Sequence, residues 1–249
     1  MSDLHAGRRY LITGATSGIG LATSILLANQ GARLVLTARR AIELERLAEQ
    51  LPGDHLAVPC DLTATDEIPQ LVGRVAREVN GLHGFVHCAG IHRVTPLKIV
   101  KSRSIEDVFS LNVIAAVMLA KGFRVRRVHA PAASIVFLSS AIGAVGQKGV
   151  SAYSASKGAV ISLTKSLALE LAGEDIRVNC VLPGVVRTPM TVALAESIGE
   201  DAFAEVEAMH PLGLGEPEDV AAPISFLLGT GSRWMTGAAV PVDGGYTAQ

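Results

Sequence analysis

The chain has 249 residues, of which 49% are hydrophobic and 18% charged, with a net charge of −1 at pH 7. Charges of both signs are mixed throughout, so neither a nucleic-acid surface nor a membrane surface is expected, and no apolar run approaches the roughly 20 residues of a transmembrane helix. Cys60, Cys88 and Cys180 are far apart and lie in apolar contexts, which indicates free thiols in a reducing compartment, the cytoplasm, with neither disulfides nor a metal site.

Short apolar runs alternate with longer segments of helical periodicity along the chain. The runs predict strands at residues 10–13, 34–37, 56–58, 84–88, 134–139, 177–182 and 239–242. A hydrophobic period near 3.6 predicts helices at residues 21–30, 41–50, 68–79, 105–123, 155–171 and 219–228. Several runs are continuous in Val, Ile and Leu, as in parallel strands buried on both faces. We therefore expect an α/β fold, a Rossmann-like doubly wound parallel sheet of about seven strands with helices on both faces.

The sequence contains no segment that would separate two domains. No linker rich in Pro, Gly or Ser divides the chain and no segment repeats, so residues 1–249 are expected to form a single domain. One long interruption, at about 188–214, separates the sixth strand from the last helix and has a helical pattern of its own. Its position predicts a mobile substrate cover over a site.

The first strand runs into the sequence TGATSGIG at residues 13–20, and a helix follows at once. Glycines allow the backbone to approach a pyrophosphate, and the helix N-terminus offers free N–H donors and positive dipole charge. The spacing differs from the common Gly-x-Gly-x-x-Gly, so an ordinary tight turn remains the alternative. The residues expected to bind a dinucleotide here are Gly14, Thr16, Ser17, Gly18, Ile19 and Gly20.

The second strand ends without a carboxylate and is followed by Arg39 and Arg40. An acidic residue at this place usually binds a free ribose 2′-hydroxyl, whereas a 2′-phosphate calls for arginine. NADP(H) is therefore favoured and NAD(H) is the second choice, although both arginines also suit the solvated start of a helix. Asp61 and Leu62, after the third strand, are expected to hold the adenine ring, with a helix N-cap as the alternative for Asp61.

Tyr153 and Lys157 are four residues apart in a helical segment and so share one face. A nearby ammonium lowers the pKa of a phenol, which suits it to exchange a proton with a carbonyl oxygen. Ser140 ends the fifth strand, where its hydroxyl can bond a substrate oxygen. Asn112, in an apolar helix, is either a structural bridge or part of a proton relay through water to Lys157. Each feature alone also has an ordinary structural explanation.

Taken in order, these residues resemble the short-chain dehydrogenase/reductase family over nearly the whole chain. The matching motifs are the turn at 13–20, Cys88-Ala89-Gly90, Asn112, Ser140, Tyr153-Ser154-Ala155-Ser156-Lys157, Pro183-Gly184 with Thr188, and Val242-Asp243-Gly244-Gly245. The resemblance implies hydride transfer between a nicotinamide cofactor and a small-molecule carbonyl or secondary alcohol. Tyr153 would be the proton donor or acceptor, Lys157 would lower its pKa and bind ribose, Ser140 would orient the carbonyl, and Asn112 would complete the relay.

The resemblance also adds residues to the expected cofactor site. They are Ala89, Gly90, Tyr153, Lys157, Pro183, Gly184, Val186 and Thr188. It implies a homotetramer, built partly from the helices near 105–123 and 155–171. One departure stands out: His87-Cys88 replaces the common Asn-Asn. An amide that braces the central strands in the family is therefore absent, and an effect on stability more than on catalysis is expected.

The expected substrate wall is largely apolar. It consists of His92, Val94, Ile142, Val150, Val185 and Met190 with the rest of the cover. A ketone, a steroid-like ring or an acyl thioester would suit such a wall. The likeness includes 3-oxoacyl-carrier-protein reductases, so 3-oxoacyl-thioester reduction is the alternative function. The arginines near 124–127 favour an acidic carrier protein, whereas Glu174 and Asp175 would repel it.

Two other classes of function remain as alternatives. A catalytically silent NADP-binding regulator is compatible with the fold, although such proteins typically lose the tyrosine or the lysine. An epimerase or dehydratase of nucleotide sugars shares the tyrosine–lysine chemistry, but it usually needs a longer C-terminal substrate region.

Overall fold

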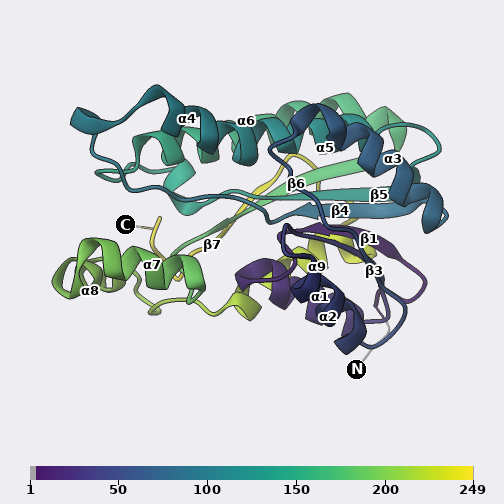
Figure 1. Ribbon diagram of the computed structural model, residues 1–249, viewed down its shortest axis with the longest axis horizontal. Coiled ribbons are helices and arrows are strands. Elements are labelled where there is room, and N and C mark those ends of the chain that lie inside the picture. Colours follow the sequence, from purple (N-terminus) through teal and green to yellow (C-terminus); the bar gives the residue numbers. More distant parts are fainter. Residues whose placement is uncertain (1–3, 249) are drawn as a thin grey trace.

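A single parallel sheet forms the centre of the computed structural model, which describes residues 4–248 (Figure 1). The strand order is β3-β2-β1-β4-β5-β6-β7. The strands are β1 (Arg9–Thr13), β2 (Arg33–Thr37), β3 (Leu56–Ala57), β4 (Leu82–His87), β5 (His129–Leu138), β6 (Ile176–Pro183) and β7 (Ala239–Val242). All neighbouring pairs are parallel. The predicted α/β fold with seven strands is confirmed.

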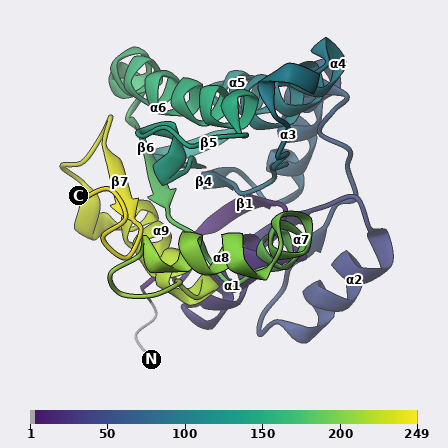
Figure 2. The same cartoon turned by 90° about the vertical axis from the view of Figure 1, so that its left-hand side faces the viewer.

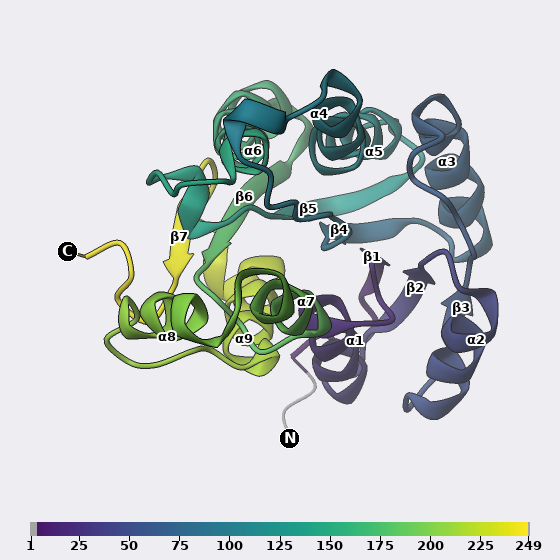
Figure 3. The same cartoon turned by 60° about the vertical axis from the view of Figure 1, so that its left-hand side comes forward.

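Helices cover both faces of this sheet. They are α1 (Gly18–Asn29), α2 (Ala41–Gln50), α3 (Ile68–Glu78), α4 (Ser102–Phe109), α5 (Ala115–Phe123), α6 (Ser151–Leu171), α7 (Pro189–Ile198), α8 (Glu200–Ala208) and α9 (Pro217–Leu228). Figure 3 shows α3, α4, α5 and α6 on one side of the sheet and α1, α2 and α9 on the other. In the described part of the chain, no helix is both long and apolar enough to cross a lipid bilayer.

Each strand contributes to two hydrophobic cores, because successive side chains point to opposite faces of a sheet. On β1, Leu11 packs in the core under α3, α5 and α6, whereas Tyr10 and Ile12 pack in the core under α1, α2 and α9. On β4, Phe85 packs in the first of these cores and Val86 in the second. Burial on both faces explains why the strands are continuous apolar runs with no polar alternation.

The predicted helix at 105–123 is not continuous. α4 ends at Phe109, a π-helical turn follows at Ser110–Ile114, and α5 begins at Ala115. One-turn π-bulges of this kind occur frequently at functional sites. Asn112 lies in the turn and is 1% exposed. Hydrophobic periodicity missed this break because apolar residues continue through it.

The sheet reverses its direction of growth between β1 and β4. The chain adds β2 and β3 on one side of β1 and then returns to place β4 on the other side. In an open α/β sheet, ligands bind outside the carboxyl ends of the strands at such a switch point. Thr13 and His87, the last residues of β1 and β4, are register partners there. The sequence at 13–20 therefore begins at the place where a ligand is expected.

His87 supplies the brace that the sequence indicated was missing. Its Nδ1 lies 2.9 Å from the Thr13 hydroxyl oxygen and its Nε2 lies 3.1 Å from the Leu111 carbonyl oxygen. A carbonyl only accepts, so Nε2 carries the hydrogen and Nδ1 accepts from Thr13, whose oxygen in turn accepts from the Ala89 N–H. The neutral imidazole thus ties β1, β4 and the π-helical turn together. The amide is absent, and an imidazole braces the central strands in its place.

The brace predicts acid-sensitive stability. Burial lowers the pKa of His87 to about 4, from the ordinary histidine value of about 6.5. The unfolded chain therefore binds a proton at a higher pH than the folded protein does, and the stabilisation is present above pH 6.5 and lost as the pH falls towards 4. We expect the free energy of unfolding to decrease by up to about 3 kcal/mol over this interval from His87 alone.

Urea unfolding at several pH values checks this expectation. His87→Gln keeps an acceptor and a donor without a titrating group, so its stability should depend less steeply on pH than that of the wild type. Burial also lowers the pKa of His83 to about 4, so the difference between the two proteins, and not the wild-type slope, isolates His87. Equal slopes for wild type and variant would contradict the prediction.

Candidate active site

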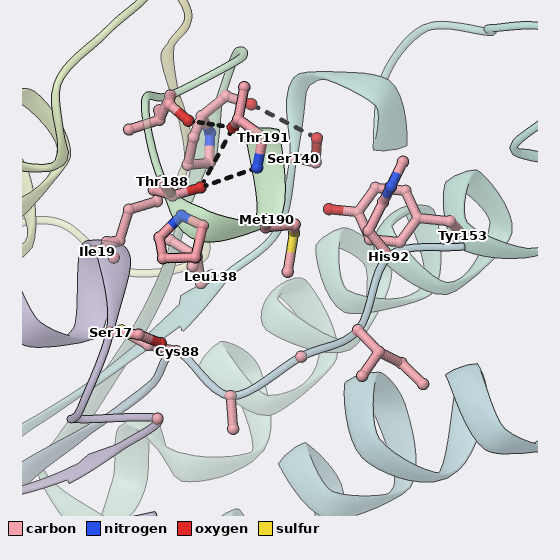
Figure 4. A pocket seen from close by; sticks show the side chains of 18 of the residues that line it. Ser17, Ile19, Cys88, His92, Leu138, Ser140, Tyr153, Thr188, Met190 and Thr191 are labelled. Atoms are coloured by element: carbon pink, nitrogen blue, oxygen red, sulfur yellow. Dashed lines mark hydrogen bonds between the residues drawn. The ribbon is translucent and has the colours of Figure 1, made fainter. Parts of the chain in front are cut away.

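A cavity of about 560 Å³ opens at the carboxyl ends of the strands (Figure 4). The predicted cofactor residues on its wall are Gly14, Thr16, Ser17, Gly18, Ile19, Gly20, Arg39, Arg40, Asp61, Leu62, Ala89, Gly90, Tyr153, Lys157, Pro183, Gly184, Val186 and Thr188. The predicted substrate residues on its wall are His92, Val94, Ile142, Val150, Val185 and Met190. Ser140 also lines the cavity, but Asn112 does not. Residues as far apart in the sequence as Gly14 and Met190 thus line one cavity.

The turn after β1 has the features of an anion site. Gly14 has a φ of +66°, and a Cβ atom there would lie 2.9 Å from the Ala89 backbone nitrogen, so a glycine is required. α1 begins at Gly18, three residues earlier than predicted, so its first turn faces the cavity. Its N-cap, Ser17, makes no side-chain capping bond, and the first turn has no acidic residue. Backbone N–H donors and dipole charge are therefore available, and the turn fits a pyrophosphate.

Arg39 and Arg40, which follow β2, both line the cavity, but they differ in their ion pairs. Arg40 forms an ion pair of 2.7 Å with Glu43, whereas no ion pair of Arg39 occurs within residues 4–248. Asp61 accepts hydrogen bonds from the backbone N–H and the hydroxyl of Thr63. These bonds, together with the charge of Arg39, lower the pKa of Asp61. Asp61 thus holds the turn after β3 and still lines the cavity. It is not a helix N-cap, because Ala64 precedes the short 3-10 helix and Glu67 precedes α3.

Tyr153 and Lys157 are buried in the first two turns of α6, with exposed fractions of 9% and 5%. The Lys157 ammonium donates to the Leu138 carbonyl over 2.7 Å and lies 5.6 Å from the centroid of the Tyr153 ring. Figure 4 shows the Tyr153 hydroxyl directed into the cavity, on the side where Ser140 and Met190 lie. The helix brings the pair together because residues four apart share a face.

Ser140 is held loosely at the end of β5. Its hydroxyl lies 3.5 Å from the Pro183 carbonyl oxygen and accepts from the Ile142 N–H over 3.3 Å. Both distances exceed the usual range for hydrogen bonds of their type. The Ser140 hydroxyl can therefore turn towards a ligand oxygen at little cost.

Burial, and not charge, dominates the acidity of the tyrosine. Burial raises the pKa of Tyr153 to about 12, while the Ser140 hydroxyl acts in the opposite direction. Burial also lowers the pKa of Lys157 to about 8. The expected lowering of the phenol pKa by Lys157 is therefore not present in this structure, because the ammonium is bonded to the Leu138 carbonyl and the phenol is desolvated. At neutral pH this site holds a protonated phenol beside a protonated amine.

Asn112 acts as a structural bridge. Its amide oxygen accepts from the Ile91 N–H over 2.9 Å, and its amide nitrogen donates to the Ile91 carbonyl and the Ser156 hydroxyl, each over 3.1 Å. These bonds join the π-helical turn to the loop after β4 and to the buried side of α6. These are the bonds of a structural bridge. The proton relay through water to Lys157 stays a prediction.

The substrate end of the cavity combines apolar side chains with a few polar groups. The His92 ring packs edge-on against the Tyr153 ring, with centroids 4.5 Å apart, and burial, with a smaller effect of Lys157, lowers the pKa of His92. Sequence reasoning did not single out Gln147, Lys148 or Thr191, which also line the cavity. For Thr191 a signal existed: Thr188-Pro189 is a typical helix start, and the Thr188 side chain caps the Thr191 N–H.

The segment predicted as a cover forms α7 and α8. Both helices lie at the end of the molecule that faces the viewer in Figure 2. Their cavity-lining residues are Pro189, Met190, Thr191, Leu194, Ile198, Ala202 and Val206. They give the substrate end a mostly apolar wall.

Arg124 is not available to an acidic partner in the way the sequence indicated. Its guanidinium forms ion pairs with Glu174 at 2.6 Å and with Glu170 at 3.3 Å. The two carboxylates offset its charge. One of the three arginines expected to attract a carrier protein is thus paired with a carboxylate expected to repel it, whereas Arg126 and Arg127 are exposed.

Comparison with known proteins gives consistent matches along the chain. A family model described as Enoyl-(Acyl carrier protein) reductase matches residues 14–247. 3-Oxoacyl-(acyl-carrier-protein) reductase FabG of Thermotoga maritima is 37% identical over 243 residues, which cover 96% of this chain and 97% of that protein. Cis-4-hydroxycyclohexanecarboxylate dehydrogenase of Sinomonas cyclohexanicum is 36% identical over 252 residues and 100% of both chains. A crystal structure of a short-chain type dehydrogenase/reductase from Mycobacterium marinum has a TM-score of 0.89 and 32% identity, covering 98% of this chain and 97% of that one.

Proposed function

The chain belongs to the short-chain dehydrogenase/reductase family and is an oxidoreductase for carbonyl or alcohol substrates, and we propose that it uses NADP(H) and reduces a carbonyl group. One observation carries the proposal. A protonated, buried Tyr153 and a buried Lys157 lie in the wall of the same cavity as the glycine turn. The same wall carries Arg39, which forms no ion pair with any residue that the structure describes. This arrangement provides a proton donor at one end and an anion site at the other.

The cofactor would lie across the carboxyl edge of the sheet. The turn at Gly14–Gly20 fits its pyrophosphate, and Arg39 would bind the 2′-phosphate. Asp61 and Leu62 would contact the adenine, Lys157 the ribose, and the loop from Pro183 to Thr188 the nicotinamide end. When bound, the reduced nicotinamide supplies a hydride to the carbonyl carbon, which is the cofactor's own chemistry.

The protein's contribution is the proton and its placement. Tyr153 would donate its hydroxyl proton to the carbonyl oxygen, and the Ser140 hydroxyl would hold that oxygen by a hydrogen bond. The ammonium of Lys157 would stabilise the phenolate that remains. A phenol whose pKa is about 12 is protonated across the neutral range, which is the state in which it can donate a proton to a carbonyl oxygen.

The same geometry predicts a pH limit. Because burial lowers the pKa of Lys157 to about 8, the ammonium is lost above this pH, well before the phenol ionises. We expect kcat/KM for reduction to be level below about pH 8 and to fall above it, since kcat/KM reports the pKa values of the free enzyme. Lys165→Met, an exposed change on the same helix, should leave the profile unchanged. A rate that stays level up to about pH 10 would contradict this role for Lys157.

The apolar wall supports a ketone or a cyclic carbonyl compound as substrate. A 3-oxoacyl thioester is the second candidate, favoured by the likeness to the Thermotoga maritima reductase. The pairing of Arg124 with Glu174 and Glu170 weakens the case for docking of an acidic carrier protein.

A substrate screen tests the proposal. Oxidation of NADPH and of NADH should be followed side by side with open-chain ketones, cyclic ketones, and 3-oxoacyl thioesters of coenzyme A and of carrier protein. We expect turnover with NADPH and at least one free ketone. Tight NADPH binding without turnover of any carbonyl would support a silent regulator, and faster turnover with NADH would overturn the cofactor assignment.

A homotetramer is part of the proposal. The helices expected at its interface carry exposed apolar side chains, including Ile114 on the π-helical turn, Val117 on α5 and Leu169 on α6. Such side chains favour association when they form a patch. Light scattering should give the mass of four chains. The three free cysteines support a reducing compartment such as the cytoplasm.

A further inference from the structure

His210 is a buried polar residue that the proposed chemistry does not use. It follows α8 and is 4% exposed. Its Nδ1 lies 2.8 Å from the Val206 carbonyl oxygen, and its Nε2 lies 3.1 Å from the Val185 backbone nitrogen. A carbonyl only accepts and an N–H only donates, so Nδ1 carries the hydrogen and Nε2 accepts. A single neutral tautomer satisfies both bonds.

These two bonds join the part of the cavity wall expected to contact substrate to the part expected to contact the nicotinamide. Val206 belongs to α8 and lines the substrate end. Val185 lies in the loop that would hold the nicotinamide end, next to Gly184 and Val186. His210 is therefore a direct side-chain link between α8 and this loop.

The surroundings of His210 fix its position. The ring stacks on Tyr246, with centroids 4.8 Å apart and an interplanar angle of 22°. A Cβ atom at Gly184 would lie 2.9 Å from His210 Nε2 and 2.9 Å from Asp243 Cα. The glycine thus allows the imidazole to approach the loop. His210, Tyr246, Val185 and Ser140 together line a second, small cavity of about 30 Å³, so the histidine lies close behind the proposed reacting groups.

We propose that His210 is a positioning residue that couples the α7–α8 segment to the loop from Pro183 to Thr188. A substrate that contacts α8 and shifts it therefore also shifts the Val185 backbone. A shift of the loop likewise moves α8. The inference rests on the proposed function for its effect on catalysis, but the mechanical link itself does not.

Other bonds keep the loop folded when this link is removed. Gly215 donates to the Val185 carbonyl over 3.1 Å and accepts from the Arg187 N–H over 2.8 Å, and the Thr191 hydroxyl donates to the Val186 carbonyl. Substitutions of His210 should therefore alter placement and leave the fold intact.

Three variants separate the two bonds of the imidazole. His210→Gln places an amide oxygen near the former Nε2 and can keep the bond from Val185. His210→Asn places an amide nitrogen near the former Nδ1 and can keep only the bond to Val206. His210→Phe keeps a ring to stack on Tyr246 and loses both. If the link to Val185 matters, Gln rescues function and Asn does not, which a purely space-filling role would not produce.

Two measurements read out the link. Hydrogen exchange on the protein without added ligands should show faster exchange of the Val185 amide in the Phe and Asn variants and wild-type exchange in the Gln variant. Steady-state kinetics with NADPH and a turned-over ketone should show about a tenfold loss of kcat/KM in Phe and Asn, with KM and kcat both affected, because the loss leaves a buried N–H unpaired.

The outcomes separate this inference from the proposed function. Wild-type exchange and wild-type kinetics in the Phe variant would overturn the coupling, even if the enzyme is active. Faster exchange in Phe and Asn but not in Gln would support the link even if no carbonyl substrate is turned over, in which case the proposed function fails alone. Equal loss in Gln, Asn and Phe would also overturn it, since the Val185 bond would then not be the determinant.

Discussion

Tyr153→Phe is expected to lower kcat/KM for carbonyl reduction by roughly 10²- to 10⁴-fold, the usual contribution of a positioned proton donor. The substitution removes only the hydroxyl group. The ring remains buried against His92, with which it packs edge-on, so the cavity keeps its shape. NADPH should bind as tightly as before, because the pyrophosphate turn and Arg39 are untouched. Steady-state kinetics and NADPH fluorescence titration measure the two effects separately.

Tyr10→Phe is a matched control for this change. Tyr10 lies on β1, is completely buried, and its hydroxyl is bonded to His5 Nδ1 over 2.8 Å. Removing that hydroxyl should lower the free energy of unfolding by about 1 kcal/mol and leave kcat/KM unchanged. The two variants should thus show opposite patterns of stability and activity. Near-normal turnover in Tyr153→Phe would mean that the proton comes from another group.

Arg39→Ser is expected to weaken NADPH binding by about 10- to 100-fold, because a charge-assisted hydrogen bond to phosphate contributes about 1.5–3 kcal/mol. The affinity for NADH should change little, since that cofactor has no 2′-phosphate. Arg40→Ser should have the smaller effect, because the Arg40 guanidinium is already paired with Glu43 at 2.7 Å. Competition titrations of both cofactors against each variant measure the preference.

The control for Arg39 is Arg46→Ser, an exposed change on α2 that removes the same charge away from the cavity. It should leave both affinities at wild-type values at moderate ionic strength, because the charges of solvent-exposed groups are screened beyond about 10 Å at 0.1 M salt. Loss of NADPH affinity in Arg46→Ser as large as in Arg39→Ser would assign the preference to overall charge. Equal affinities for NADPH and NADH in the wild type would remove the role of Arg39 altogether.

Much of the fold could be predicted because its signals lie among neighbouring residues. The apolar runs gave all seven strands, and the prediction for β7 matches its bounds. The glycines at 13–20 predicted a turn, and the structure places that turn against the cavity. The four-residue spacing of Tyr153 and Lys157 was sufficient to place both on one face of a helix. Boundaries were less certain: α6 begins at Ser151, and β5 begins at His129, five residues before the predicted strand.

Other properties depended on partners that no local pattern reveals. The sequence shows a histidine at position 87 where the family commonly has an amide. It does not show that the imidazole bonds Thr13, which is 74 positions away. The spacing of Lys157 could not show that its ammonium would donate to Leu138, nor that burial would raise the pKa of Tyr153 to about 12. The ion pair between Arg124 and Glu174 forms because the fold brings the end of α5 close to the end of α6, and no local pattern in the sequence indicates this contact.

The sequence by itself determined the secondary structure, the doubly wound topology and the residue types that meet at the switch point, because periodicity, turn chemistry and chain handedness act over short distances. The tertiary structure alone decided the break in the helix at Asn112, the brace at His87, the acidity of Tyr153 and the link through His210. Each of these depends on desolvation or on a hydrogen bond between segments that are distant in sequence. Such energies are defined only when the chain has folded.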